Sequence, residues 1–186
     1  MTTSHYRPRL QTRSVDARSL GFLIAGAGSQ AAQVMLPAIR QQPPVAGSRD
    51  VAGAWVAAIY SHNERRARDF ANTHAIIHAG AELPALLRRP EIHCVYIASH
   101  PRHHAEAVLA ALEADKHVLC EPPLALDEEE AAQLKRMAET RGLVLALNYA
   151  WRAVAAINQV HELLAAEAIG ELLGGSLRNT AYLQPA

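Results

Sequence analysis

The sequence has only two cysteines, no excess of either charge and no long apolar run, and each shortage excludes a class of protein. Cys94 and Cys120 lie within separate apolar segments, so we expect buried reduced thiols and no disulfide framework. The 18 Lys and Arg residues balance the 18 Asp and Glu residues, which favours neither nucleic acid nor an anionic membrane as a partner.

The apolar segments are also too short for a membrane protein. None approaches the roughly 20 residues that cross a bilayer, and the first residues lack the apolar core of a secretory signal. We therefore predict a cytoplasmic protein with no membrane partner. No internal repeat or low-complexity tract interrupts the chain.

What the sequence does have is apolar residues for one substantial core. Half of its 186 residues are hydrophobic, and that length suits one domain but is short for two. Residues 1–20 are polar, with four arginines against one acid, and predict a flexible arm; an anion-binding tail is the alternative. We expect a main domain over residues 21–149 and only the start of a second domain over residues 150–186.

The most informative stretch is a glycine-containing turn near the start of this main domain. A short apolar run, residues 22–25, meets Gly26 and Gly28 and then a helix-forming segment. Gly26 would allow a tight turn, and Gly28 would let the backbone approach a ligand. The N–H groups of Ser29 and Gln30, at the helix start, would then face a pyrophosphate. The pattern predicts dinucleotide binding, with a plain structural turn as the alternative.

Apolar strand-like runs alternate with helical segments along the rest of the chain. Strands are expected at residues 54–60, around 76–77, and at 94–99, 118–120 and 143–147, with helices between them. This alternation predicts an α/β fold with a doubly wound parallel sheet. Because ligands bind beyond the carboxyl ends of such strands, we expect one edge to gather five residues: Gly26, Ser61, Ser99, Glu121 and Asn148.

The end of the second strand bears on the choice between NADP and NAD. An acidic residue there would bind a ribose 2′-hydroxyl and repel a 2′-phosphate. This chain instead has Ser61, followed by His62, Arg65 and Arg66. A small hydroxyl near cations favours a 2′-phosphate, and hence NADP over NAD. The alternative is that the two arginines belong to a solvated helix face.

Taken together, several ordered motifs resemble the Gfo/Idh/MocA oxidoreductase family. The matching segments are Gly26-Ala27-Gly28 with residues 36–38 (LPA), residues 95–99 (VYIAS) with 104–106 (HAE), residues 116–126 (KHVLCEPPLAL), Asn148-Tyr149, and residues 169–172 (IGEL). The resemblance covers about residues 20–183 and implies a Rossmann domain that holds a nicotinamide dinucleotide. It also implies hydride transfer on a sugar- or polyol-like substrate and a second, mixed α/β domain that often forms the oligomer interface.

The resemblance adds site residues to those from the sheet edge. Ala98 and His104 would lie beside the cofactor, although His104 could equally be a helix-start residue without a role. The cofactor-binding set is then Gly26, Gly28, Ser29, Gln30, Ser61, His62, Arg66, Ala98, Ser99, His104, Glu121 and Asn148. The catalytic residues stay unknown, with Tyr149 and His104 as candidates and a packing role as the alternative for Tyr149. The spacing of the histidines near residue 100 predicts no metal site.

Two departures from the family pattern affect the expected activity. The family's Glu-Lys-Pro motif, whose lysine is implicated in catalysis, reads Glu121-Pro122-Pro123 here. The family's catalytic Asp and His would come from a helix beyond residue 186. We therefore expect an NAD(P)-dependent oxidoreductase whose activity is weakened or incomplete in this truncated chain. The alternative is a catalytically degenerate module with a binding, regulatory or assembly role. Residues 171–183 are expected to form a strand that pairs with another chain in a homo- or hetero-oligomer.

Overall fold

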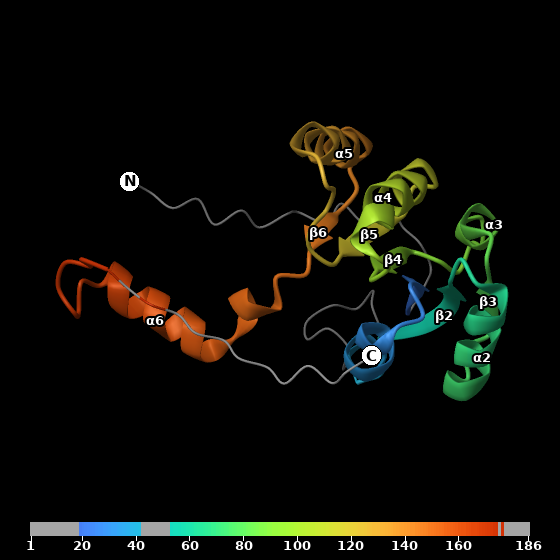
Figure 1. The fold of residues 1–186 in the computed structure, drawn as a ribbon, viewed down its shortest axis with the longest axis horizontal. Coiled ribbons are helices and arrows are strands. Elements are labelled where there is room, and N and C mark those ends of the chain that lie inside the picture. The colour runs from blue at the N-terminus through green and yellow to red at the C-terminus, as the bar shows by residue number, and fades with distance from the viewer. Residues whose placement is uncertain (1–18, 42–52, 175, 177–186) are drawn as a thin grey trace. The chain divides into compact units, whose positions relative to one another are not determined.

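The computed structural model describes residues 19–41, 53–174 and 176, which fall into two units divided after Asn148. The first unit is built on a six-stranded parallel sheet in the order β3-β2-β1-β4-β5-β6 (Figure 1). Its strands are β1 Leu20–Ala25, β2 Ala54–Tyr60, β3 His78–Gly80, β4 Cys94–Ile97, β5 His117–Cys120 and β6 Leu145–Leu147. This strand order is that of the doubly wound dinucleotide-binding fold, which confirms the predicted fold class.

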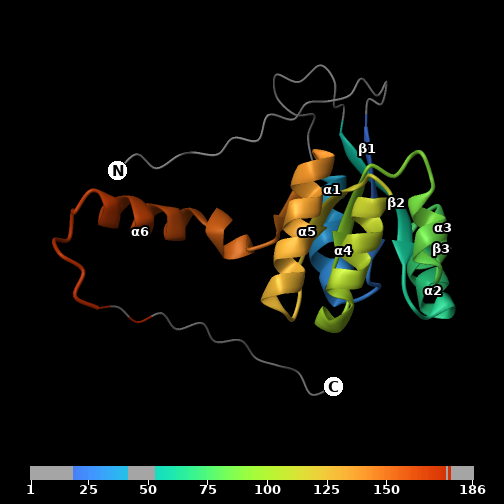
Figure 2. The same ribbon diagram turned by 90° about the horizontal axis from the view of Figure 1, so that it is seen from above.

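Helices connect the strands and cover both faces of the sheet (Figure 2). They are the π-helical turn η1 Ala31–Met35, α1 Leu36–Arg40, α2 Glu64–His74, α3 Leu83–Leu87, the 3₁₀ turn η2 Pro101–His103, α4 His104–Glu113 and α5 Glu128–Arg141. The buried residues form two clusters. One joins α3, α4 and α5 to one face of the sheet, and the other joins η1, α1 and α2 to the opposite face.

Alternation along the central strands places side chains in both clusters. In β1, Leu23 and Ala25 belong to one cluster and Ile24 to the other; in β4, Tyr96 lies opposite Val95 and Ile97. All of these residues are fully buried. The near-continuous apolar character of the strands is therefore explained by helices on both faces.

Local sequence signals explain the ends of the two longest helices of the first unit, α2 and α5. The side chain of Asn63 accepts a hydrogen bond from the backbone N–H of Arg66 at 3.0 Å, which caps α2. Asp127 caps α5 in the same way, by accepting from the N–H of Glu130 at 3.0 Å. Gly142 ends α5 in the left-handed conformation, with φ +66°.

One predicted feature of the first unit differs in the structure. The third strand lies at His78–Gly80 and not around residues 76–77, because Ile76 is buried beside α2 while Ile77 is 69% exposed. The helix after β1 contains a π-helical turn just before Pro37, in which the N–H of Leu36 bonds to the carbonyl of Ala31. Residues 42–52 lie outside the described residues, as does the predicted arm except for its last two residues.

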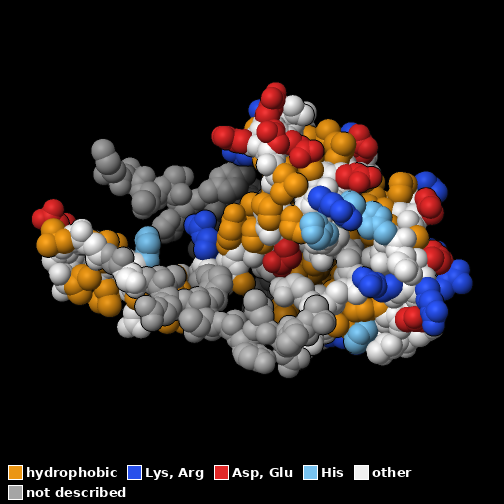
Figure 3. All heavy atoms as spheres, viewed as in Figure 1, with side chains coloured by type: hydrophobic (Ala, Val, Ile, Leu, Met, Phe, Trp, Pro, Cys, Tyr) orange, Lys and Arg blue, Asp and Glu red, His pale blue; other side chains and the backbone are white. Residues whose placement is uncertain are grey.

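The second unit contains the 3₁₀ turn η3 Ala150–Ala153 and α6 Ala155–Ala165. Hydrophobic side chains lie along it (Figure 3), and Val160 and Leu163 on α6 are 53% and 44% exposed. Of the strand predicted at residues 171–183, the described part has no strand, and the remainder lies outside the described residues. Its pairing with another chain stays a prediction. No helix in the described part of the chain has the length and apolar character of a membrane span.

Candidate dinucleotide-binding site

The carboxyl ends of the strands form one continuous edge, as predicted. Backbone hydrogen bonds join the residues that leave neighbouring strands: Gly26 N–H to the carbonyl of Tyr60 at 2.9 Å, Glu121 N–H to Ile97 at 2.9 Å, and Asn148 N–H to Cys120 at 2.8 Å. The five residues expected at this edge each follow a different strand of the parallel sheet. The structure therefore brings Gly26, Ser61, Ser99, Glu121 and Asn148 to the same end of the sheet.

Gly26 leaves β1 in a conformation that only glycine adopts readily. Its φ is +125°, and a Cβ there would lie 2.6 Å from the carbonyl oxygen of Ala98 and 2.8 Å from the nitrogen of Ser99. The turn after β1 thus packs directly against the turn after β4. The predicted role of Gly26 in a tight turn is confirmed.

Gly28, unlike Gly26, has open space beside it. A Cβ built on Gly28 would meet no protein atom within 4 Å, and Gly28, Ser29 and Gln30 are exposed. The first bond of the following helix runs from the N–H of Ala32 to the carbonyl of Gly28, so the N–H groups of Ser29 and Gln30 have no partner within the helix. Open space beside free amides at a helix start fits an anionic diphosphate.

Ser99 provides a second observation that fits a ligand at this edge. Its hydroxyl oxygen is buried and has no hydrogen-bond partner among the described residues. A buried polar atom without a partner costs free energy unless water or a ligand supplies one. The open space at Gly28 and the unpartnered hydroxyl of Ser99 therefore fit a polar cofactor.

His104 holds two loops of the site together. Its side chain is 1% exposed, with Nδ1 lying 2.7 Å from the carbonyl oxygen of Pro123 and Nε2 2.9 Å from that of Ser99. Both ring nitrogens thus face backbone carbonyls of the loops that follow β4 and β5. This geometry gives His104 a positioning role, and its direct contact with a cofactor or substrate stays a prediction.

The carboxylate of Glu121 is the centre of a polar network that spans three strands. Its Oε1 accepts from the hydroxyl of Tyr96 at 2.5 Å and from the side-chain amide of Asn148 at 2.6 Å. Burial, and then the hydrogen bond and charge of Glu121, raise the pKa of Tyr96 well above its usual range, so this hydroxyl remains a donor. Burial, followed by the charge of Glu121, also raises the pKa of the Cys120 thiol to about 12. Sequence reasoning missed Tyr96, although a tyrosine in a buried strand needs a partner for its hydroxyl.

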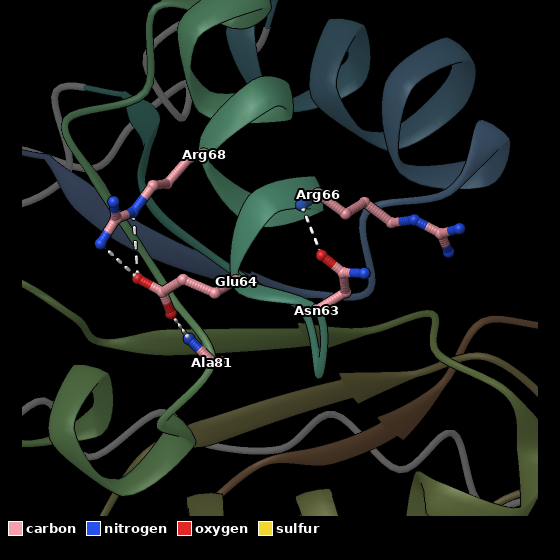
Figure 4. A network of polar contacts seen from close by, with 5 residues as sticks. All are labelled: Asn63, Glu64, Arg66, Arg68 and Ala81. Atoms are coloured by element: carbon pink, nitrogen blue, oxygen red, sulfur yellow. Dashed lines mark hydrogen bonds and ion pairs between the residues drawn. The ribbon is translucent and has the colours of Figure 1, made fainter.

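The residues expected to bind a 2′-phosphate lie just before α2 or in its first turn, and Figure 4 shows one of them, Arg66, beside the capping residue Asn63. Ser61 is 9% exposed and its hydroxyl accepts from the N–H of Asn63 at 3.3 Å. The guanidinium of Arg66 points away from the pair formed by Glu64 and Arg68, whose atoms are 2.8 Å apart. Among the described residues Arg66 has no carboxylate within ion-pair distance, whereas Arg65 lies 3.7 Å from Asp69. Arg66 is therefore the arginine here whose charge no neighbouring acid offsets.

A cavity of about 230 Å³ adjoins this region and includes residues that sequence reasoning did not identify. Tyr60 and His62 border it from the end of β2, and His103 borders it from the turn before α4. The full lining is Tyr60, His62, Ala81, Glu82, Leu83, Pro84, Ser99, His103, Glu106, Ala107 and Ala110. His62 and Ser99 in this lining were expected from the sequence, whereas Glu82, His103 and Glu106 come from other segments that only packing brings to them. No group of three metal-binding side chains suited to an ion occurs in the described part of the chain.

The strand order, the glycine turn and the open edge define a Rossmann dinucleotide-binding domain. Residues 20–149 match the family model described as "Oxidoreductase family, NAD-binding Rossmann fold" (Gfo/Idh/MocA). The chain belongs to this family, which confirms the resemblance seen in the sequence. The cofactor class predicted from the sequence, a nicotinamide dinucleotide, is that of the family.

Among curated relatives, a 1,5-anhydro-D-fructose reductase of Ensifer adhaerens is 30% identical over 76% of this chain and 42% of its own length. A dTDP-3,4-didehydro-2,6-dideoxy-alpha-D-glucose 3-reductase of Saccharopolyspora spinosa is 36% identical over 80% of this chain and 42% of its own. Among solved structures, a 3-ketoreductase from Actinomadura kijaniata in complex with NADP and TDP-benzene is 31% identical, with a TM-score of 0.71 over 82% of this chain and 44% of its own. The chain thus spans less than half the length of these relatives.

Proposed function

We propose that this chain is the cofactor-binding part of an oxidoreductase that transfers hydride between NADP and a sugar- or polyol-like substrate. The observation that carries the proposal is the pairing of open space at Gly28 with the buried, unpartnered hydroxyl of Ser99. Both lie at the sheet edge where this fold class binds dinucleotides. The names of the reductases that resemble the chain support a sugar-derived substrate.

Each part of the dinucleotide has a proposed partner in the first unit. The N–H groups of Ser29 and Gln30 bind the diphosphate, and Ser61, His62 and Arg66 bind the 2′-phosphate. The cavity beside Tyr60 and His62 receives the adenine. The Glu121 network with Tyr96 and Asn148 fixes the loops at the other end of the edge. The bound nicotinamide supplies or accepts the hydride.

The proposal predicts that the chain binds NADPH at least roughly tenfold more tightly than NADH. The 2′-phosphate gains a charge-assisted hydrogen bond, which contributes about 1.5–3 kcal/mol. Fluorescence titration of the purified chain with each dinucleotide measures the difference. Arg66→Met should reduce the affinity for NADPH alone. Arg68→Met, at an arginine already paired with Glu64, is the matched control and should leave the ratio unchanged. Equal affinities for the two dinucleotides would contradict the assignment.

Pro122 favours a second candidate function, a dinucleotide-binding module without catalysis. Pro122 stands where the family motif has its lysine and offers no proton to transfer. Lys116 cannot replace that lysine, because it precedes β5 and so lies at the opposite end of the parallel sheet. The hydroxyl of Tyr96 donates a hydrogen bond to Glu121, and both ring nitrogens of His104 face backbone carbonyls. Both side chains are therefore already engaged and do not stand in for the missing lysine.

An activity assay on the native chain and its Pro122→Lys variant distinguishes the two candidates. Loss of a general acid or base typically costs about 10²–10⁴-fold in rate. If the chain is a weakened oxidoreductase, Pro122→Lys should raise NADPH-dependent reduction of keto sugars by roughly 10²-fold or more. If it is a binding module, both proteins should bind NADPH and neither should oxidise it with any carbonyl substrate. Absorbance at the reduced nicotinamide band follows the reaction directly.

A further inference from the structure

We propose that the carboxylate of Glu121 makes this chain bind the oxidised dinucleotide more tightly than the reduced one, by opposing the positive charge of the oxidised nicotinamide ring. The inference rests on the proposed function, because it requires that the chain bind a nicotinamide dinucleotide. It adds a preference for one redox state. The residues assigned to the diphosphate and the 2′-phosphate cannot produce such a preference, because those groups are the same in both states.

The topology places Glu121 on the nicotinamide side of the sheet edge. In the order β3-β2-β1-β4-β5-β6, the connections reverse direction between β1 and β4, and a dinucleotide lies across that point in folds of this class. Because the 2′-phosphate is assigned to the end of β2, the nicotinamide half extends over β4 and β5. Glu121 directly follows β5, and its N–H bonds to the carbonyl of Ile97 at the end of β4.

The two hydrogen-bond donors to Glu121 orient its carboxylate without neutralising it. Oε1 accepts from the hydroxyl of Tyr96 at 2.5 Å and from the side-chain amide of Asn148 at 2.6 Å, an arrangement that suits an ionised carboxylate. Burial, then the hydrogen bond and charge of Glu121, raise the pKa of Tyr96, so its hydroxyl keeps its proton. Both donors are uncharged groups, and neither offsets the negative charge.

No basic side chain in the described part of the chain forms an ion pair with this carboxylate. The ion pairs found there all involve other acids. His104 contacts the loop after β5, but its two ring nitrogens face the carbonyls of Pro123 and Ser99. Among the described residues Oε2 of Glu121 has no hydrogen-bond partner, and the side chain is half-buried. A half-buried charge without a counter-ion favours a cationic group in the ligand.

The nicotinamide ring is the group whose charge changes with redox state, since it carries one positive charge when oxidised and none when reduced. An opposite charge about 4–6 Å away favours the charged form of a titrating group by roughly 10- to 1000-fold. Because Glu121 is partly exposed and therefore partly screened, we expect the lower end, a preference of roughly tenfold. For a two-electron couple, a tenfold preference lowers the reduction potential of the bound cofactor by about 30 mV. Glu121 thereby stabilises the state that follows hydride transfer to a substrate carbonyl.

The test compares the affinities of the full chain for NADPH and NADP⁺ at neutral pH. NADPH is titrated by its fluorescence, and NADP⁺ is then added to displace it. We expect NADP⁺ to bind roughly tenfold more tightly than NADPH. NAD⁺ and NADH should show a similar ratio, because the ring charge changes in the same way whether or not the 2′-phosphate is present. Equal affinities for NADP⁺ and NADPH, or tighter binding of NADPH, would overturn the inference.

Two variants assign the preference to the charge. Glu121→Gln keeps an acceptor oxygen for Tyr96 and Asn148 but removes the charge, and should abolish most of the preference by weakening the binding of NADP⁺ and not of NADPH. Glu113→Gln is the matched control, because Glu113 is exposed at the end of α4, at the opposite end of the sheet, and it should behave like the native chain. Thermal denaturation checks that both variants fold.

The outcomes separate this inference from the proposed function. A native preference for NADP⁺ that persists in Glu121→Gln would overturn the inference, since the charge would not be its cause. If the native chain binds neither redox state of either dinucleotide, the proposed function itself fails. The ratio measured on the native chain tests the inference even if Glu121→Gln does not fold.

Discussion

Replacing Gly28 with leucine is expected to abolish dinucleotide binding while the fold stays intact. A Cβ at this position meets no protein atom within 4 Å, and the backbone of Gly28 is not in the left-handed region, so the side chain is tolerated. The leucine instead occupies the space where the diphosphate must approach the N–H groups of Ser29 and Gln30. Charge-assisted hydrogen bonds contribute about 1.5–3 kcal/mol each, so losing two or more weakens binding by at least roughly 100-fold.

Two measurements check this expectation together. Titration with NADPH reports the affinity, and thermal denaturation followed by circular dichroism reports the fold. Gly174→Leu is the matched control, since Gly174 also has open space and an unstrained backbone but lies in the second unit. Native affinity in the Gly28 variant would mean that the glycine turn serves only to connect β1 to its helix.

Local signals allowed much of the fold to be predicted from sequence. The bounds of β2, residues 54–60, follow from one uninterrupted apolar run, and the caps at Asn63 and Asp127 follow from short-range hydrogen bonds. The third strand shows where such signals fail. Its residues, His78–Gly80, have no apolar pattern and become a strand only by pairing with β2. The apolar residues just before it pack on α2 or face solvent.

The candidate site likewise has a part that the sequence predicts and a part that only the packing of helices reveals. Parallel topology alone brings residues that follow different strands to one edge, so Gly26, Ser99 and Glu121 could be placed together from sequence. The cavity beside His62 depends instead on how α3 and α4 pack against the strand ends, which brings Glu82, His103 and Glu106 close to it. No spacing in the sequence relates these segments. Residues such as these are therefore found only once the helices are in place.

Replacing Gly26 with alanine is expected to destabilise the first unit severely. The methyl group would lie 2.6 Å from the carbonyl oxygen of Ala98, and the φ of +125° is one that alanine rarely adopts. Backbone strain of this kind costs about 1–3 kcal/mol, and separating the turns after β1 and β4 adds to it. Because domains of this size are stable by only about 5–15 kcal/mol, the melting temperature should fall on the order of 10 °C.

Gly142→Ala is the control that separates the cost of backbone strain from the cost of the steric clash. Gly142 also has a positive φ, +66°, but a Cβ there meets nothing within 4 Å, so its replacement introduces conformational strain without a steric clash. Thermal denaturation should therefore show a small loss for Gly142→Ala and a much larger one for Gly26→Ala. Equal losses would mean that the two turns move apart at little cost. In that case the close approach of Gly26 to Ala98 would not hold the sheet edge together, and only the space beside Gly28 would matter for the dinucleotide.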